Sequence, residues 1–132
     1  MRLEHVLHGE VQDLLDQLAR ALIAGDGEAV AALWETPAFV IGSDGVTAIS
    51  SREQVAKFFG GVKYNADGVK RTRADLLDLE RVGNRIVIAA VRWPHLDAAD
   101  REMNSESSDY TLRRDDNGKL KIRAVLMRGT TK

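Results

Sequence analysis

Proton transfer is the chemistry to which His95 and Asp109 are best suited. A histidine changes charge near neutral pH, and a carboxylate can accept and return a proton. Arg92 has a fork of donors that suits a ligand carboxylate. Each residue also has a structural interpretation. His95 can be solvated or bonded to backbone after Pro94, Asp109 can pair with an arginine across the strands, and Arg92 can be an exposed strand residue.

Aromatic side chains suggest a second kind of site. Six of the chain's aromatic residues fall at positions expected to form a pocket: Trp34, Phe39, Phe58, Phe59, Trp93 and Tyr110. A concave site with aromatic walls and a few polar groups suits a flat, mostly apolar small molecule. The same residues can instead fill the core of a small domain. We expect such a ligand, with any acidic group met by Arg92 or His95.

The composition of the chain excludes several other classes of function. The 132 residues have no Cys and a formal net charge of −1. Thiolate chemistry is therefore excluded, and no overall field attracts nucleic acid or an acidic membrane. His5 and His8 lack carboxylate partners at ligand spacing, so we expect no metal and no cofactor. There is no signal-peptide pattern and no apolar run long enough for a membrane span, so a soluble cytoplasmic protein is expected.

Helical periodicity dominates residues 1–62. Apolar residues recur at the spacing of one helix face at Val11, Leu14, Leu15, Leu18 and Leu22. They predict a first helix that Gly25 ends, and Asp26 is expected to cap a second, short helix. Pro37 is expected to end that helix, because proline lacks an N–H and disfavours helix in the preceding residue.

A third helix is predicted to begin at a capping box formed by Ser50 and Glu53 or by Ser51 and Gln54. Its inward face would carry Val55, Phe58 and Phe59.

Strand patterns dominate the rest of the chain. Residues 38–41 and 46–49 predict a hairpin. After a basic loop at 63–72, four longer strand-like runs follow, at 74–82, 85–93, 103–114 and 120–128. Pro94 is expected to end or bulge the second of these. Helices first and strands afterwards predict an α+β domain, with one curved, mostly antiparallel sheet and helices on one face.

This order of elements resembles the nuclear transport factor 2-like superfamily, which includes SnoaL-like proteins and steroid delta-isomerases. The resemblance spans about residues 8–128. Its local marks are ALIAGD (21–26), ALW (32–34), REQVAKFF (52–59) and GKLKIRAV (118–125). It implies one domain over residues 1–132. The implied fold is a cone, or cystatin-like α+β roll, with the sheet wrapped around the N-terminal helices and a pocket at the open end.

Steroid isomerases use a carboxylate base, a tyrosine and a protonated aspartic acid. The resemblance places the tyrosine position at Leu18 and the base position near Gly42, and neither residue can perform that chemistry. The third position falls within Ser108, Asp109 and Tyr110. If Tyr110 faces inward, strand alternation turns Asp109 outward. The resemblance therefore favours a SnoaL-like protein without the isomerase residues.

Three hypotheses follow. The leading one is a small-molecule-binding pocket protein, with no activity assigned. The second is a lyase, isomerase or hydrolase that uses His95 or Asp109 as its acid–base group. The third is a homodimeric interaction module with a plugged pocket. Residues 86–91 are apolar on both faces of their strand, which predicts sheet burial on both sides and a homodimer through the sheet face.

Overall fold

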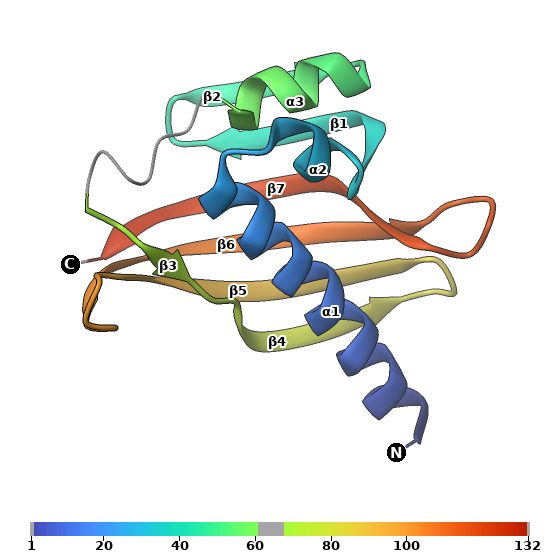
Figure 1. The fold of residues 1–132 in the computed structure, drawn as a ribbon. Coiled ribbons are helices and arrows are strands. Elements are labelled where there is room, and N and C mark those ends of the chain that lie inside the picture. The colour runs from blue at the N-terminus through green and yellow to red at the C-terminus, as the bar shows by residue number, and fades with distance from the viewer. Residues whose placement is uncertain (1, 61–67, 132) are drawn as a thin grey trace.

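The sheet and its helices follow the predicted order in a computed structural model that describes residues 2–60 and 68–131 (Figure 1). The elements are α1 (Arg2–Ala24), α2 (Gly27–Ala31), β1 (Trp34–Gly42), β2 (Gly45–Ile49), α3 (Arg52–Gly60), β3 (Arg71–Thr72), β4 (Asp75–Val82), β5 (Ile86–Leu96), β6 (Glu102–Arg114) and β7 (Leu120–Thr131). Residues 63–67 of the predicted basic loop lie outside the described residues. The α+β class is confirmed.

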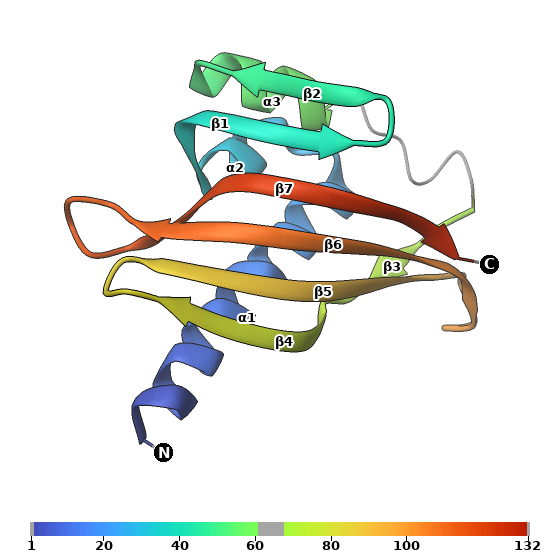
Figure 2. The same cartoon turned by 180° about the vertical axis from the view of Figure 1, so that it is seen from behind.

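The strands form one mixed sheet in the order β2-β1-β7-β6-β5, and both β3 and β4 pair with β5. Of the strand pairs, β1–β7 is parallel and the others are antiparallel. Figure 1 shows α1 lying across one face of this sheet. Seen from behind, the opposite face carries no helix among the described elements (Figure 2). The curved sheet therefore has one inner face, toward α1, and one outer face.

The core lies between α1 and the inner face. Val11, Leu15 and Leu18 of α1 are at most 2% exposed. They belong to one cluster with Leu112 and Ile122 of the sheet. Fully burying side chains of this size stabilises the fold by roughly 1.5–3 kcal/mol each. The helical spacing in the sequence thus identified the core face of α1.

The start of α3 distinguishes the two predicted capping boxes. The Gln54 backbone N–H donates to Ser51 Oγ at 3.2 Å. In return, Gln54 Oε1 accepts from the backbone N–H groups of Ser51 at 3.3 Å and Ser50 at 2.6 Å. The Ser51–Gln54 box is therefore the one that forms, and it satisfies amides that the first turn of a helix leaves without partners.

Pro37 does not end α2, which contradicts the sequence-based expectation. The helix ends at Ala31, and β1 begins at Trp34 and contains Pro37. The register between β1 and β7 shifts between Trp34 and Phe39. Pro37 lies inside this irregular stretch, where no regular ladder bond needs its missing N–H.

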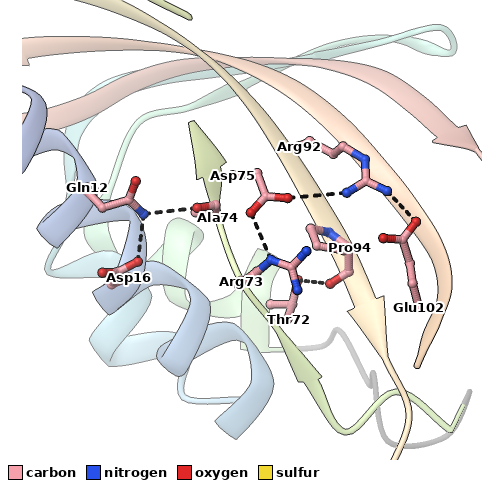
Figure 3. Close-up of polar contacts among 9 residues, drawn as sticks. All are labelled: Gln12, Asp16, Thr72, Arg73, Ala74, Asp75, Arg92, Pro94 and Glu102. Carbon is pink, nitrogen blue, oxygen red and sulfur yellow. Dashed lines mark hydrogen bonds and ion pairs between the residues drawn. The ribbon is translucent and has the colours of Figure 1, made fainter. Parts of the chain in front are cut away.

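Pro94 does not end its strand either, since β5 continues to Leu96. The pairing with β6 is irregular close to Pro94, because its register shifts between His95 and Leu96. Along one edge of β5, the partner strand changes from β4, which reaches Arg92, to β3, which reaches His95. The Pro94 carbonyl accepts a hydrogen bond from Thr72 Oγ1 at 2.9 Å on that edge (Figure 3). A proline is tolerated at this joint because neither β3 nor β4 pairs with it. His95 is therefore part of β5, where it pairs with Thr72 of β3.

Candidate functional site

A cavity of about 470 Å³ lies between the inner face of the sheet, α1 and α3. It is lined by Leu18, Leu22, Trp34, Phe58, Phe59, Val69, Thr72, Trp93, His95, Met103, Asn104, Glu106, Ser108, Tyr110, Val125, Met127 and Thr130. A second hollow of about 460 Å³ reaches the tip of the β1–β2 hairpin. The two share Phe58, Glu106, Ser108, Met127 and Thr130 as lining residues. We refer to them as the inner cavity and the outer hollow.

Two groups of aromatic rings form walls of the inner cavity. On one side, the ring centroids of Trp34 and Phe59 are 5.2 Å apart, and those of Phe58 and Phe59 are 4.9 Å apart. On the other, Trp93 and Tyr110 meet edge to face at 6.1 Å. Phe58 is 41% exposed, so it is less inward than the helix pattern predicts. These five residues are those the sequence analysis placed in a pocket, apart from Phe39.

His95 and Glu106 bring titratable groups to the inner cavity. His95 is 6% exposed, and its Nε2 lies 3.7 Å from Glu106 Oε2. This separation exceeds that of a hydrogen bond, although an ion pair forms when the imidazole is protonated. Trp93 faces Glu106 across the β5–β6 ladder, which places Glu106 beside the aromatic wall.

Glu106 is the functional candidate that the sequence analysis missed. The signal was present in the alternation of β6, because Glu106, Ser108 and Tyr110 are two residues apart and share one face. All three line the inner cavity. The same alternation turns Asp109 outward, as the inward orientation of Tyr110 predicts.

Asp109 has the cross-strand arginine pair that was its structural interpretation, and it does not reach the cavity as an acid–base group would need to. Its Oδ2 accepts a hydrogen bond from Arg128 Nε at 2.9 Å, and it does not line the inner cavity. Phe39 is also misplaced, since it is 44% exposed and pairs with Ala124 on the outer face. In both cases the residue occupies the alternate strand position that points away from α1.

Arg92 also lies outside the inner cavity, contrary to expectation. Its guanidinium donates to Asp75 Oδ2 at 3.3 Å and to Glu102 Oε2 (Figure 3). The hydrogen bond to Glu102 raises the pKa of Arg92 above its ordinary value. Its neighbours Val91 and Trp93 are the inward residues of β5, so Arg92 takes the outward position. The guanidinium group of Arg92 was expected to bind a ligand carboxylate, and it binds two carboxylates of the chain itself.

Two further polar atoms near the inner cavity lack partners. Trp34 Nε1 and Asn104 Oδ1 are buried and make no hydrogen bond within the described structure. Most buried polar groups in proteins make a hydrogen bond, so these two atoms are available to bond a polar group of a bound molecule.

Across residues 2–60 and 68–131, no group of three or more His, Cys, Asp or Glu could hold a metal ion.

A family model for NTF2-like proteins (DUF6841) matches residues 9–130. This covers nearly the whole chain. The chain belongs to this NTF2-like family. No functionally curated protein matches the sequence significantly.

Solved structures show the same NTF2-like fold. A structure from Catenulispora acidiphila has a TM-score of 0.73 at 18% identity, covering 97% of this chain and 94% of that one. Aln2 from a Streptomyces species has a TM-score of 0.73 at 18% identity, with coverage of 92% and 89%. A ketosteroid isomerase-like protein from Erwinia carotovora atroseptica gives 0.67 at 11% identity, covering 92% and 95%. At these identities the likeness establishes the fold, and function has to be argued from the site.

The NTF2-like fold places two residues of interest at its hollows. Leu18, at the tyrosine position implied by the steroid isomerase resemblance, lines the inner cavity. Gly42, near the position of the base, lines the outer hollow. Both positions therefore line the hollows, but neither residue has the tyrosine hydroxyl or the carboxylate that a steroid isomerase uses there. In the part of the chain that the structure describes, no helix is long and apolar enough to cross a membrane.

Proposed function

We propose that this NTF2-like protein binds an apolar or aromatic small molecule in the inner cavity. The observation that carries the proposal is the cavity of about 470 Å³ walled by Trp34, Phe59, Trp93 and Tyr110. This volume falls within the range of small-molecule sites, which are mostly apolar with a few placed polar groups. The open cavity weighs against the alternative of a plugged pocket.

Tryptophan fluorescence offers a direct test. The chain has two Trp, and both Trp34 and Trp93 line the inner cavity. Titration with 1-naphthalenemethanol, a flat apolar probe, should therefore change the emission in a saturable way. A linear, non-saturating response, together with no heat of binding in calorimetry, would contradict the proposal.

A matched pair of variants locates the probe. Met127 lines the inner cavity, whereas its neighbour Leu126 lies opposite Asp109 on the outer face. Met127→Trp should weaken calorimetric binding of the probe at least tenfold by occupying the volume, and Leu126→Trp should leave it unchanged. Equal effects of the two variants would place the probe elsewhere.

Acid–base catalysis is a second candidate, favoured by the approach of His95 Nε2 to Glu106 Oε2 at 3.7 Å. A carbonyl compound in the inner cavity could lose a proton from the carbon next to its carbonyl to His95, and recover one at the same carbon. Incubation with 2-tetralone in D₂O would show deuterium uptake by NMR. Uptake no faster than in His95→Gln would eliminate this candidate.

We further propose a homodimer through the outer face of the sheet. Phe39, Ile88 and Leu126 are apolar residues of that face and are at least 36% exposed. An apolar sheet face with no covering helix is a common site of self-association. Ile88→Lys should shift the molar mass in sedimentation equilibrium from dimer to monomer. Val6→Lys, at an exposed position on α1, serves as the control and should not.

A further inference from the structure

Among the described residues that line the two hollows, the side chains that carry a full charge at neutral pH are carboxylates. Asp44 and Glu106 line the outer hollow, and Glu106 also lines the inner cavity. Among the described residues that line either hollow there is no Lys or Arg. His95 is the one described lining residue able to carry a positive charge. The described lining thus offers carboxylates to a ligand and contains none of the guanidinium or ammonium donors that bind anions.

Glu106 differs in its pairing from Glu35 and Asp109, two carboxylates of the sheet that each bond an arginine. Asp109 bonds Arg128 at 2.9 Å, and Glu35 Oε1 lies 2.8 Å from Arg123 Nη1. For Glu106, the nearest cationic group in the described structure is His95, at 3.7 Å. Its carboxylate therefore keeps acceptor positions available on the side that faces the hollows.

The aromatic walls supply a complementary attraction. An ammonium group within about 6 Å of an aromatic centroid is attracted by the negative face of the ring, most strongly for Trp. Trp93 lies directly opposite Glu106 in the ladder, and Tyr110 contacts Trp93 edge to face. A cation held by Glu106 would therefore lie beside the indole ring of Trp93, while the apolar body of the same molecule filled the inner cavity.

We infer that the ligand of this site is an amine: an apolar or aromatic molecule whose ammonium group pairs with Glu106. The inference rests on the proposed small-molecule function and narrows its ligand class. It replaces the expectation of an acidic group met by Arg92 or His95. Arg92 lies outside the inner cavity and is already paired with Asp75 and Glu102. His95 lines the cavity, but the carboxylate of Glu106 lies 3.7 Å from it.

Three probes with the same ring test the inference: 1-naphthalenemethylamine, 1-naphthalenemethanol and 1-naphthoic acid. Dissociation constants come from calorimetry, supported by tryptophan fluorescence. The amine should bind about tenfold more tightly than the alcohol, a ratio typical of one charge-assisted contact, and the acid should bind most weakly. Added salt should reduce the preference for the amine.

Two isosteric variants assign the preference to one carboxylate. Glu106→Gln should bind the amine and the alcohol equally, whereas Asp109→Asn, on the outer face of the same strand, should keep the wild-type ratio. Thermal melting checks that both variants fold, and Glu106→Asp provides a second variant, with an intermediate preference expected.

The outcomes separate the inference from the proposed function. Binding of all three probes with equal affinity, or tightest binding of the acid, would overturn the inference and leave a small-molecule site. An amine preference that survives in Glu106→Gln would also overturn it. If no probe binds, the proposed function itself fails, and the inference fails with it.

Discussion

The inner and outer faces of the sheet are built from the same strands but use their polar residues differently. On β6, Glu106, Ser108 and Tyr110 face the hollows, while Asp109 faces outward and bonds Arg128 at 2.9 Å. The outer carboxylates Asp75 and Glu102 are likewise bound by Arg92 (Figure 3). Glu106 has no arginine partner in the described structure. Glu106 is thus distinguished from Asp75, Glu102 and Asp109 by its place in the hollows together with its pairing, and not by residue type.

The largest expected effect is a loss of stability on removal of a core side chain from the inner face. Leu112 is fully buried, and the adjacent Thr111 faces outward opposite Ile88. Leu112→Ala should lower the free energy of unfolding by about 2–5 kcal/mol, because it leaves a void in the core. Thr111→Ala should change it by no more than about 0.5 kcal/mol. Urea denaturation measures both, and similar losses would refute the assignment of the two faces.

A second pair of variants compares a carboxylate that an arginine binds with Glu106, whose cationic neighbour in the described structure is His95. Glu10 bonds Arg114 through both oxygens, at 2.7 and 2.9 Å, which raises the pKa of Arg114. Glu10→Gln should lower the free energy of unfolding by about 1 kcal/mol, as for a partly exposed bidentate pair.

Glu106→Gln provides the opposing measurement. Because Glu106 makes no arginine pair within the described structure, its replacement should leave the free energy of unfolding within about 0.5 kcal/mol of wild type. A loss as large as that of Glu10→Gln, in the same denaturation experiment, would show that Glu106 serves the stability of the fold.

The smallest expected effect lies far from both faces, in the β6–β7 turn. Backbone N–H groups of Lys119 and Asn117 donate to Asp115 Oδ1, at 2.9 Å each, and lower the pKa of Asp115. The ordinary pKa of an aspartate side chain is about 3.9. The stabilisation is therefore fully present above that pH and is lost as the pH falls through the lower folded-state pKa.

Melting temperatures between pH 5 and pH 2 test this turn. Asp115→Asn keeps an acceptor oxygen but cannot titrate, so it should lose less stability than wild type on acidification. If the melting temperatures of the two proteins fall in parallel with pH, the stability of the turn does not depend on the charge of Asp115.

The fold could be predicted from the sequence because its signals are local. The spacing of Val11, Leu15 and Leu18 identifies the core face of α1, and Ser51 with Gln54 identifies the start of α3. The extent of β1 could not be predicted in this way, because Pro37 is tolerated only by an irregular pairing with a strand far along the chain. The two-residue strand β3 is too short to leave a pattern.

The candidate site was predicted less completely. Trp34, Trp93 and His95 were expected at a pocket and do line the inner cavity. Phe39 was misplaced because alternation says which residues share a face, but not which face curves around α1. Arg92 was misplaced because it is adjacent to Trp93 on β5, and alternation allows only one of the two to face the cavity. Applied from Tyr110 backward along β6, the same alternation would have revealed Glu106.

The outer hollow has a consequence for how such proteins diversify. One of its walls is the tip of the β1–β2 hairpin, residues 42–47, whereas the inner cavity is bounded by core strands and α1. Hairpin tips tolerate insertions and substitutions that core strands do not. Relatives could therefore change what they recognise at the outer end of a ligand by altering this loop, while the aromatic chamber beneath it stays the same.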